Sequence, residues 1–179
     1  MRIISGSHRG KKIIAPTNLP VRPTTDFAKE SLFNILNNYF HFDSISVLDL
    51  FAGTGNISYE FAARGAISVI AVDNNMNCAN FIQKTAQSLS FDNLNVLSSD
   101  AITYLKSSTQ QFNIIFADPP YDWDKYDTIP QLVFEKNRLL RDGFLVIEHA
   151  VSINFESHPK FYQQRNYGKV NFSIFAENL

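Results

Sequence analysis

The chain of 179 residues contains one cysteine, Cys78, and only four histidines. A single thiol excludes an intrachain disulfide and a zinc site built from several cysteines. The histidines are scattered without metal-ligand spacing, at positions 8, 41, 149 and 158, so we expect no bound metal. The sequence therefore favours a function that needs neither a disulfide framework nor metal chemistry.

Long apolar runs are also lacking. No stretch approaches the ~20 apolar residues that cross a membrane, and none has the character of a secretory signal. Hydrophobic residues nevertheless make up 45% of the chain and include 16 phenylalanines, which is enough for a full core. Since repeats, low-complexity tracts and long linkers are absent too, we expect one soluble, cytoplasmic domain that spans residues 1–179. A monomer is the default expectation, because hairpins of the chain can cover its sheet edges.

Net charge is −1, but the charges are distributed unevenly. The first thirty residues carry six basic side chains, Lys29 included, and only two acidic ones. Residues 2–4 and 12–14 flank a polar segment at 5–10, which predicts a β-hairpin with basic residues near its turn. An ordered basic loop of this kind could contact nucleic-acid phosphates, whereas the alternative is a solvated terminal arm. The candidate phosphate contacts are Arg2, Arg9, Lys11, Lys12 and Arg22.

The apolar run at 112–117 predicts a buried strand that ends directly in Asp118-Pro119-Pro120-Tyr121. Two prolines cannot donate backbone hydrogen bonds, and their carbonyl oxygens can accept, beside an acidic side chain and an aromatic ring. These groups can accept hydrogen bonds from an exocyclic base amine and stack on its ring. The alternative is an ordinary strand that ends in a proline turn.

Residues 47–56 predict a strand that runs into a glycine turn at Gly53 and Gly55 and then a helix. A second strand, at 68–72, ends in Asp73, about twenty residues after Gly53, where nucleotide-binding units place a carboxylate against ribose hydroxyls. A solvated acid at a strand end is the alternative. The third glycine of the dinucleotide pattern is missing, since Ser58 and Tyr59 occupy that stretch. A ligand with a ribose and no pyrophosphate therefore fits better.

Further strands are expected at 94–97, before Asp100, and at 143–147, before Glu148. A helix capped by Thr24 or Thr25 should follow Pro23. Alternation of strands and helices predicts an α/β fold with a mostly parallel, doubly wound sheet, and residues 161–165 and 169–175 predict a C-terminal antiparallel hairpin. In such sheets ligands bind at the carboxyl ends of the strands, where the motifs described above all fall.

Together these residues resemble the RsmD-type methyltransferases, a family that modifies guanine N2 in 16S ribosomal RNA. The resemblance covers nearly the whole chain. The Arg22-Pro23-Thr24-Thr25-Asp26 segment discriminates best, because Asp-Pro-Pro-Tyr is shared by many amino-methyltransferases. The other matching segments are Arg2-Ile3-Ile4-Ser5-Gly6 with Arg9-Gly10, Glu30-Ser31-Leu32-Phe33-Asn34, residues 49–55 and Tyr167-Gly168.

The resemblance implies a Rossmann-like class I fold, with a catalytic core at 23–179 and a basic β-hairpin extension at 1–22. It also implies S-adenosylmethionine as cofactor, with Asp49 at the methionine part, Asp73 at the ribose and Asp100 at the adenine amine. Cys78 is expected outside the site. The implied cofactor-binding residues are Thr24, Thr25, Asp49, Phe51, Gly53, Gly55, Asp73, Asn74, Asp100 and Ala101.

By the same resemblance, the catalytic residues are Asp118, Pro119, Pro120 and Tyr121, and the basic candidates above bind RNA. A guanine N2 is a poor nucleophile because its lone pair is delocalised into the ring. Hydrogen bonds from its N–H₂ to the Asp118 carboxylate and the Pro119 carbonyl favour a tetrahedral nitrogen that attacks the methyl group in line, and Tyr121 stacks on the base.

The expected substrate is a guanine of 16S rRNA within the assembled or assembling small ribosomal subunit. Two alternatives remain open. One is a DNA or RNA adenine-N6 methyltransferase that uses the same four residues, and the other is a non-catalytic nucleic-acid-binding module on the same fold. Trp123 either stacks on RNA or caps the core beneath its loop.

Overall fold

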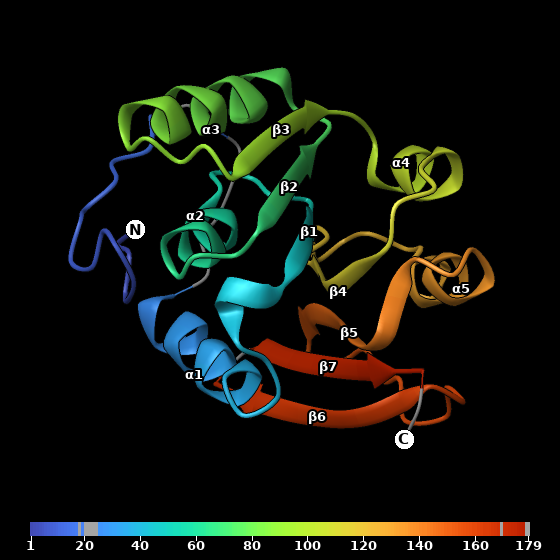
Figure 1. The fold of residues 1–179 in the computed structure, drawn as a ribbon. Coiled ribbons are helices and arrows are strands. Elements are labelled where there is room, and N and C mark those ends of the chain that lie inside the picture. Colours follow the sequence, from blue (N-terminus) through green and yellow to red (C-terminus); the bar gives the residue numbers. More distant parts are fainter. Residues whose placement is uncertain (18, 20–24, 169, 178–179) are drawn as a thin grey trace.

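The computed structural model describes residues 1–17, 19, 25–168 and 170–177, and these residues form one seven-stranded sheet with helices on both faces (Figure 1). The strand order is β3-β2-β1-β4-β5-β7-β6. The strands are β1 (Ser46–Leu50), β2 (Ser68–Asp73), β3 (Leu94–Ser98), β4 (Phe112–Ala117), β5 (Leu139–Ala150), β6 (Phe161–Tyr167) and β7 (Val170–Ala176).

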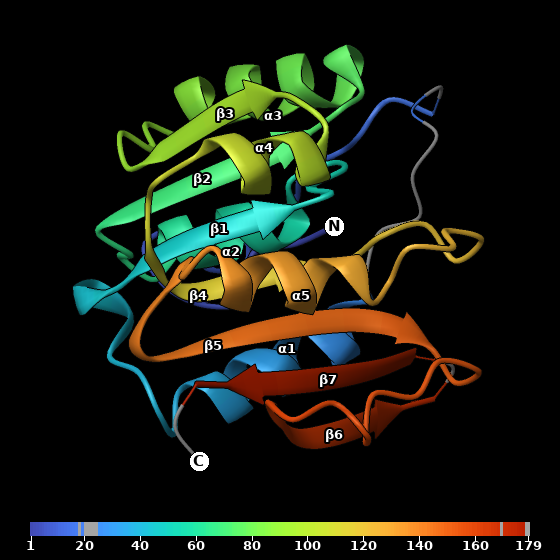
Figure 2. The same ribbon diagram turned by 90° about the vertical axis from the view of Figure 1, so that its right-hand side faces the viewer.

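Strands β1 to β5 are parallel, and β7 runs antiparallel to both β5 and β6. Figure 2 shows β1, β3 and β5 pointing one way and β7 the other. The predicted mostly parallel sheet with a C-terminal antiparallel hairpin is therefore confirmed. Strand β5 is longer than the predicted 143–147 because it continues past the parallel pairing to accompany β7 through Ala150.

The helices divide into two layers (Figure 1). One layer contributes to the core cluster that contains Val47 and Phe116, and the other to the cluster that contains Leu48 and Ile115. Because both faces of the sheet are covered, the central strands are continuous apolar runs rather than alternating ones. The first layer is α1 (Asp26–Leu36), α2 (Asn56–Ala63) and α3 (Met76–Ser88), and the second is α4 (Ala101–Ser107) and α5 (Thr128–Glu135).

Helix α1 begins where the sequence predicts. The Thr25 side chain caps it by accepting a hydrogen bond from the Ala28 backbone N–H at 3.2 Å. The alternative cap, Thr24, lies outside the described residues. No helix among the described residues is long and apolar enough to cross a membrane.

The N-terminal segment is less regular than predicted. The expected β-hairpin is reduced to a single antiparallel bridge between Arg2 and Lys12. The polar turn bonds to helix α2 instead, since the Ser7 N–H donates to the Ala63 carbonyl at 2.8 Å. Ile3 and Ile13 are buried in the core cluster of the first helix layer, so this segment packs on the sheet's own core. The expected boundary at 22 and 23 lies outside the described residues.

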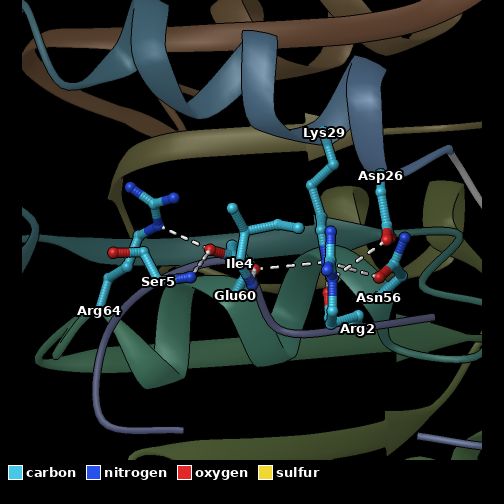
Figure 3. Close-up of polar contacts among 8 residues, drawn as sticks. All are labelled: Arg2, Ile4, Ser5, Asp26, Lys29, Asn56, Glu60 and Arg64. Atoms are coloured by element: carbon cyan, nitrogen blue, oxygen red, sulfur yellow. Dashed lines mark hydrogen bonds and ion pairs between the residues drawn. The ribbon is translucent and has the colours of Figure 1, made fainter. Parts of the chain in front are cut away.

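A buried polar network fastens that segment (Figure 3). Lys29, one of the six basic residues among the first thirty, is only 1% exposed. Its ammonium donates to the Arg2 carbonyl at 2.7 Å and to Asn56 Oδ1 at 2.8 Å. It also lies 3.3 Å from Glu60 Oε2. Burial lowers the pKa of Lys29, and the Glu60 carboxylate opposes that effect.

The Glu60 carboxylate is the centre of the network. It accepts the backbone N–H groups of Ile4 at 2.8 Å and Ser5 at 3.0 Å, and Arg64 Nε at 2.9 Å. One buried side chain on α2 therefore holds the N-terminal segment and, through Lys29, helix α1. Lys29 consequently has a structural place inside the protein and is not part of a phosphate-contacting surface.

Replacing Glu60 tests this arrangement. Glu60→Gln should lower the free energy of unfolding by about 3 kcal/mol, because the Lys29 ammonium would remain buried without its counter-charge. Urea unfolding followed by circular dichroism measures the loss. The matched control is Glu177→Gln, which breaks an ion pair to Lys160 that is 33% and 47% exposed, and should cost less than about 1 kcal/mol. Equal losses in the two variants would contradict the central role of Glu60.

Candidate active site

A cavity of about 790 Å³ opens at the carboxyl ends of the central parallel strands, the edge to which β1 and β5 point in Figure 2. Its walls include the start of α1, the 51–55 turn, residues 73–75, residues 118–121 and the tip of the final hairpin. The volume falls within the ~300–1,000 Å³ typical of small-molecule sites. The predicted cleft is therefore present at the predicted edge.

Carboxyl groups from four neighbouring strands line this cavity. In the sheet, Phe116 pairs with Asp49 and Ala117 with Ile147. Asp118 and Glu148 therefore follow at the same level on adjacent strands, and both point to the face on which Asp49 lies, because side chains alternate along a strand. The carboxyl groups from these four strands are Asp49, Asp73, Asp118 and Glu148, and Asp100, after β3, also lines the cavity.

Asp73 holds the 51–55 turn in place. Its Oδ2 accepts the Gly53 N–H at 2.7 Å, and its Oδ1 accepts the Asn75 N–H at 2.8 Å. Gly53 has φ 56° and Phe51 has φ 60°, a backbone region that is costly for a phenylalanine. Burial raises the pKa of Asp73, and the two backbone hydrogen bonds oppose that effect. Each oxygen has a second lone-pair site for a ligand hydroxyl.

Asp49 is the most deeply placed of these acids. It is 1% exposed, and Ser58 on α2 donates its hydroxyl proton to Asp49 Oδ2. Burial raises the pKa of Asp49 to about 7, with the charge of Asp73 contributing in the same direction. Ser58 occupies the stretch where the third glycine of a dinucleotide site would stand, so its role here is to position Asp49.

The surroundings of Asp118 disfavour its ionised form. Burial raises its pKa well above the usual range, and the negative charges of Glu148 and Asp49 raise it further. Its backbone N–H donates to the Leu50 carbonyl at 3.3 Å, which ties the 118–121 segment to the end of β1. A positive charge or an N–H donor in the cavity would favour the ionised form of Asp118.

The two proline carbonyls are not both as open as the sequence suggests. Pro120 accepts the Trp123 N–H at 2.9 Å and the Tyr126 hydroxyl at 3.2 Å. Pro119 lies 3.4 Å from the same hydroxyl, and a carbonyl that shares one proton keeps a lone pair for a ligand. Tyr126 is 4% exposed, and its pKa is raised to about 12, first by burial, so it stays a hydroxyl donor. Tyr126 thus positions the segment, a role that the sequence did not reveal.

Trp123 lines the cavity, and its ring packs against two other aromatic rings. Its ring centroid is 5.2 Å from that of Phe51 and 5.8 Å from that of Tyr126, both edge-on. It packs against the core cluster of the second helix layer. These contacts favour the core-capping alternative, although the residue also lines the cavity.

Most predicted site residues line the cavity: Thr25, Asp49, Phe51, Gly53, Asp73, Asn74, Asp100 and residues 118–121. Gly55 and Ala101 are not among the described lining residues, because Gly55 caps α2 at φ 80° and Ala101 is buried in the first turn of α4. Asp100 caps α4 by accepting the Thr103 N–H at 2.8 Å. Thr24 and Arg22 lie outside the described residues.

Other lining residues were missed. The expectation that Cys78 lies outside the site is wrong, because the first turn of α3 brings it to the cavity wall. Burial raises the pKa of this thiol to about 11. Asn75, which caps α3, and Glu148 also line the cavity. Glu148 carried a usable signal, since it follows the apolar run of the fifth strand.

The basic candidates separate into two places. Arg2 and Lys12 line a shallow pocket beside Thr25, next to the cavity, and Arg2 lies 3.4 Å from Asp26. Arg9 belongs to the turn that packs on the last residues of α2, at the opposite end of that helix from the cavity. Lys11 and Lys12 are exposed. Among the basic candidates that the structure describes, Arg2 and Lys12 therefore adjoin the site.

Comparison with known proteins agrees with this geometry. A family model described as Conserved hypothetical protein 95 matches residues 1–176. The chain is 37% identical over 153 residues to the Bacillus subtilis protein named "Putative rRNA methyltransferase YlbH", which covers 83% of the chain and 82% of that protein. It is 32% identical over 152 residues to the ribosomal RNA small subunit methyltransferase D of Haemophilus influenzae, which covers 83% of the chain and 78% of that protein.

A solved structure agrees as well. The Escherichia coli protein described as "Putative methyltransferase yhhF" superposes with a TM-score of 0.86 at 26% identity, over 98% of this chain and 96% of that one. The predicted methyltransferase fold is confirmed. The family match spans almost the whole chain and includes both the N-terminal segment and the cavity, so this protein belongs to the Conserved hypothetical protein 95 family, that of the RsmD-type methyltransferases.

Proposed function

We propose that this protein transfers a methyl group from S-adenosylmethionine to the exocyclic N2 amine of a guanine in 16S rRNA of the small ribosomal subunit. The observation that carries the proposal is that the Asp73-held turn and the 118–121 segment open into one cavity. The proposed ribose-binding and amine-binding groups therefore share one space. Membership of the RsmD-type family supports ribosomal RNA as the substrate class.

The residues on the cofactor side fit the proposed donor. S-adenosylmethionine, when bound, supplies an electrophilic methyl group on a positively charged sulfur. Asp73 would accept the ribose hydroxyls, and Asp49 would face the amino-acid part, whose ammonium is also positive. Asp100 lines the same cavity and would accept the adenine amine. A cluster of buried carboxylates is unfavourable in an empty cavity and favourable around a cation, so its charge matches this ligand.

The acceptor side is the 118–121 segment. The Asp118 carboxylate and the Pro119 carbonyl would accept the two N–H groups of the amine and direct the nitrogen lone pair away from the ring. The new nitrogen–carbon bond would form as the sulfur–methyl bond breaks, with that electron pair left on sulfur, and the nitrogen must then lose a proton. The Asp118 carboxylate would take it, and its raised pKa makes it a stronger base than an exposed aspartate. The Tyr121 ring, 53% exposed at the cavity mouth, would stack on the base.

The base must leave its stack to enter the cavity, at a cost of a few kcal/mol that is smallest for an unpaired nucleotide. An unpaired guanine is therefore the favoured target. The protein would act in the cytoplasm, as a monomer, on rRNA of the assembled or assembling subunit.

Nucleoside analysis tests the proposed reaction. Small subunits from cells that lack the gene, incubated with this protein and S-adenosylmethionine, should gain N2-methylguanosine at one 16S rRNA position, detected by mass spectrometry. Asp118→Ala should abolish the product while leaving cofactor binding by calorimetry nearly unchanged, because Asp118 contacts the acceptor. N6-methyladenosine as the product would favour the adenine alternative. A wild-type protein without measurable cofactor binding would favour the non-catalytic module.

The pH dependence of cofactor binding tests the role of Asp49. Burial raises the pKa of Asp49 to about 7, and a cationic ligand favours the carboxylate. Binding should therefore release a proton, and affinity should rise with pH and level off above about 7, by at most tenfold per pH unit for one group. Calorimetry between pH 5.5 and 8.5 (roughly one and a half units either side of that pKa) measures this. Asp49→Asn should bind the cofactor more weakly, and its affinity should depend less on pH. If its affinity depended on pH as steeply as that of the wild type, another group would be the one that titrates.

The two groups of basic residues predict different effects on RNA binding. Lys12→Gln, beside the cavity, should weaken RNA affinity a few-fold and flatten its dependence on salt, because one phosphate contact is lost. Arg9→Gln, at the far end of α2, is the matched control and should change both much less. Filter binding between 50 and 200 mM salt, a range in which phosphate contacts dominate the affinity change, compares them. A larger effect at Arg9 would place the RNA on the opposite side of the segment.

A further inference from the structure

Glu148 is a buried acid that lines the cavity, and the proposed reaction does not use it. Its residue is 3% exposed, and its side chain lines the cavity from the carboxyl end of β5. It stands level with Asp118 on the adjacent strand, and strands in a sheet are about 4.8 Å apart. The charge of Glu148 is one cause of the raised pKa of Asp118, which shows that the two groups interact. The acceptor end of the cavity therefore presents two carboxyl groups side by side.

The edge of a guanine matches such a pair. Its N2 amine and its N1–H are neighbouring donors, with no acceptor between them. Adenine differs at the corresponding place, because the atom beside its N6 amine is N1, which carries a lone pair. A carboxylate accepts hydrogen bonds and cannot donate one, so it attracts the guanine edge and repels the adenine edge. Two N–H donors would also relieve the repulsion between the two carboxylates.

We propose that Glu148 accepts the N1–H of the target guanine while Asp118 accepts from the N2 amine, so that Glu148 determines the choice of guanine over adenine. This inference rests on the proposed function and adds a residue that selects the base. The neighbouring strands carry the two carboxyl groups to one wall at one level. Asp118 belongs to a segment common to many amino-methyltransferases, whereas Glu148 comes from a different strand and can select the base independently.

The test changes the base at the modified position. Small subunits are assembled with 16S rRNA that carries guanine or 2-aminopurine at that position. 2-Aminopurine keeps the 2-amine, but its N1 has a lone pair in place of the N–H and its C6 lacks the oxygen. The missing oxygen affects every protein variant alike, so a change in preference between variants reports on N1. The wild-type protein should prefer guanine by about 100-fold or more in kcat/KM, because a buried acceptor would face a lone pair.

In Glu148→Gln the side-chain amide can turn its NH₂ toward N1. The preference for guanine should therefore fall at least about tenfold, through both slower guanine methylation and faster 2-aminopurine methylation. Equilibrium binding of the two RNAs with S-adenosylhomocysteine present, followed for the second RNA by 2-aminopurine fluorescence, should show the same convergence. A purely structural role for Glu148 would lower both activities together and leave their ratio unchanged.

Glu156→Gln is the matched control, since Glu156 is an exposed acid that is not among the cavity-lining residues described, and its ratio should equal that of the wild type. An unchanged ratio in Glu148→Gln overturns the inference. If Glu148→Gln does not fold, Glu148→Asp keeps the charge but shortens its reach, and should also lower the preference for guanine; an unchanged ratio there overturns the inference equally. A wild-type protein that fails to methylate the guanine RNA at all would instead count against the proposed function.

Discussion

The constraint on which this site depends is the alignment of neighbouring strands at one edge of the sheet. At this edge β1, β2 and β5 each contribute an acid and β4 is followed by one, so Asp49, Asp73, Asp118 and Glu148 meet around one cavity. Burial and mutual repulsion raise the pKa of Asp49 and Asp118, which makes the ligand-free arrangement costly. A cationic ligand on one side of the cavity and the N–H donors of a base on the other would stabilise the ionised carboxylates and lower that cost. The charge of the pocket therefore suits both a sulfonium donor and an amine acceptor.

Much of this could be predicted from the sequence, because strand order and strand ends follow from local patterns. The apolar run before Asp118 and the spacing from Gly53 to Asp73 identify strand ends, and parallel strands bring such ends together. Gly55 and Ala101 show the limit of that reasoning. A motif residue can begin a helix without lining the cavity, as Gly55 does by capping α2. Whether a motif residue lines the cavity or begins a helix depends on the direction of the backbone at that residue. The spacing of residues in the sequence does not specify that direction.

The number of basic residues near the N-terminus does not predict the position of Lys29. Basic residues clustered near an N-terminus are usually exposed, yet this one is buried against Glu60, a residue thirty-one positions away along the chain. The pairing forms only when α1 and α2 pack in one layer, so no local pattern reveals it. The same applies to Cys78, which lies at the cavity wall because of the way α3 packs in the fold. Long-range packing, rather than local propensity, decided both positions.

The network around Glu60 reaches the cavity wall at Asn56. Lys29 donates to Asn56, the first residue of α2, and Asn56 lines the cavity just after the turn that Asp73 holds. The start of α2 is therefore constrained from two sides, by Asp73 through Gly53 and by Lys29 through Asn56. Because Lys29 also bonds the carbonyl of Arg2, the basic segment beside the cavity and the glycine turn share one buried anchor. A site that must align a methyl donor with an RNA base gains from this common anchor, since small misplacements of reacting atoms cost large factors in rate.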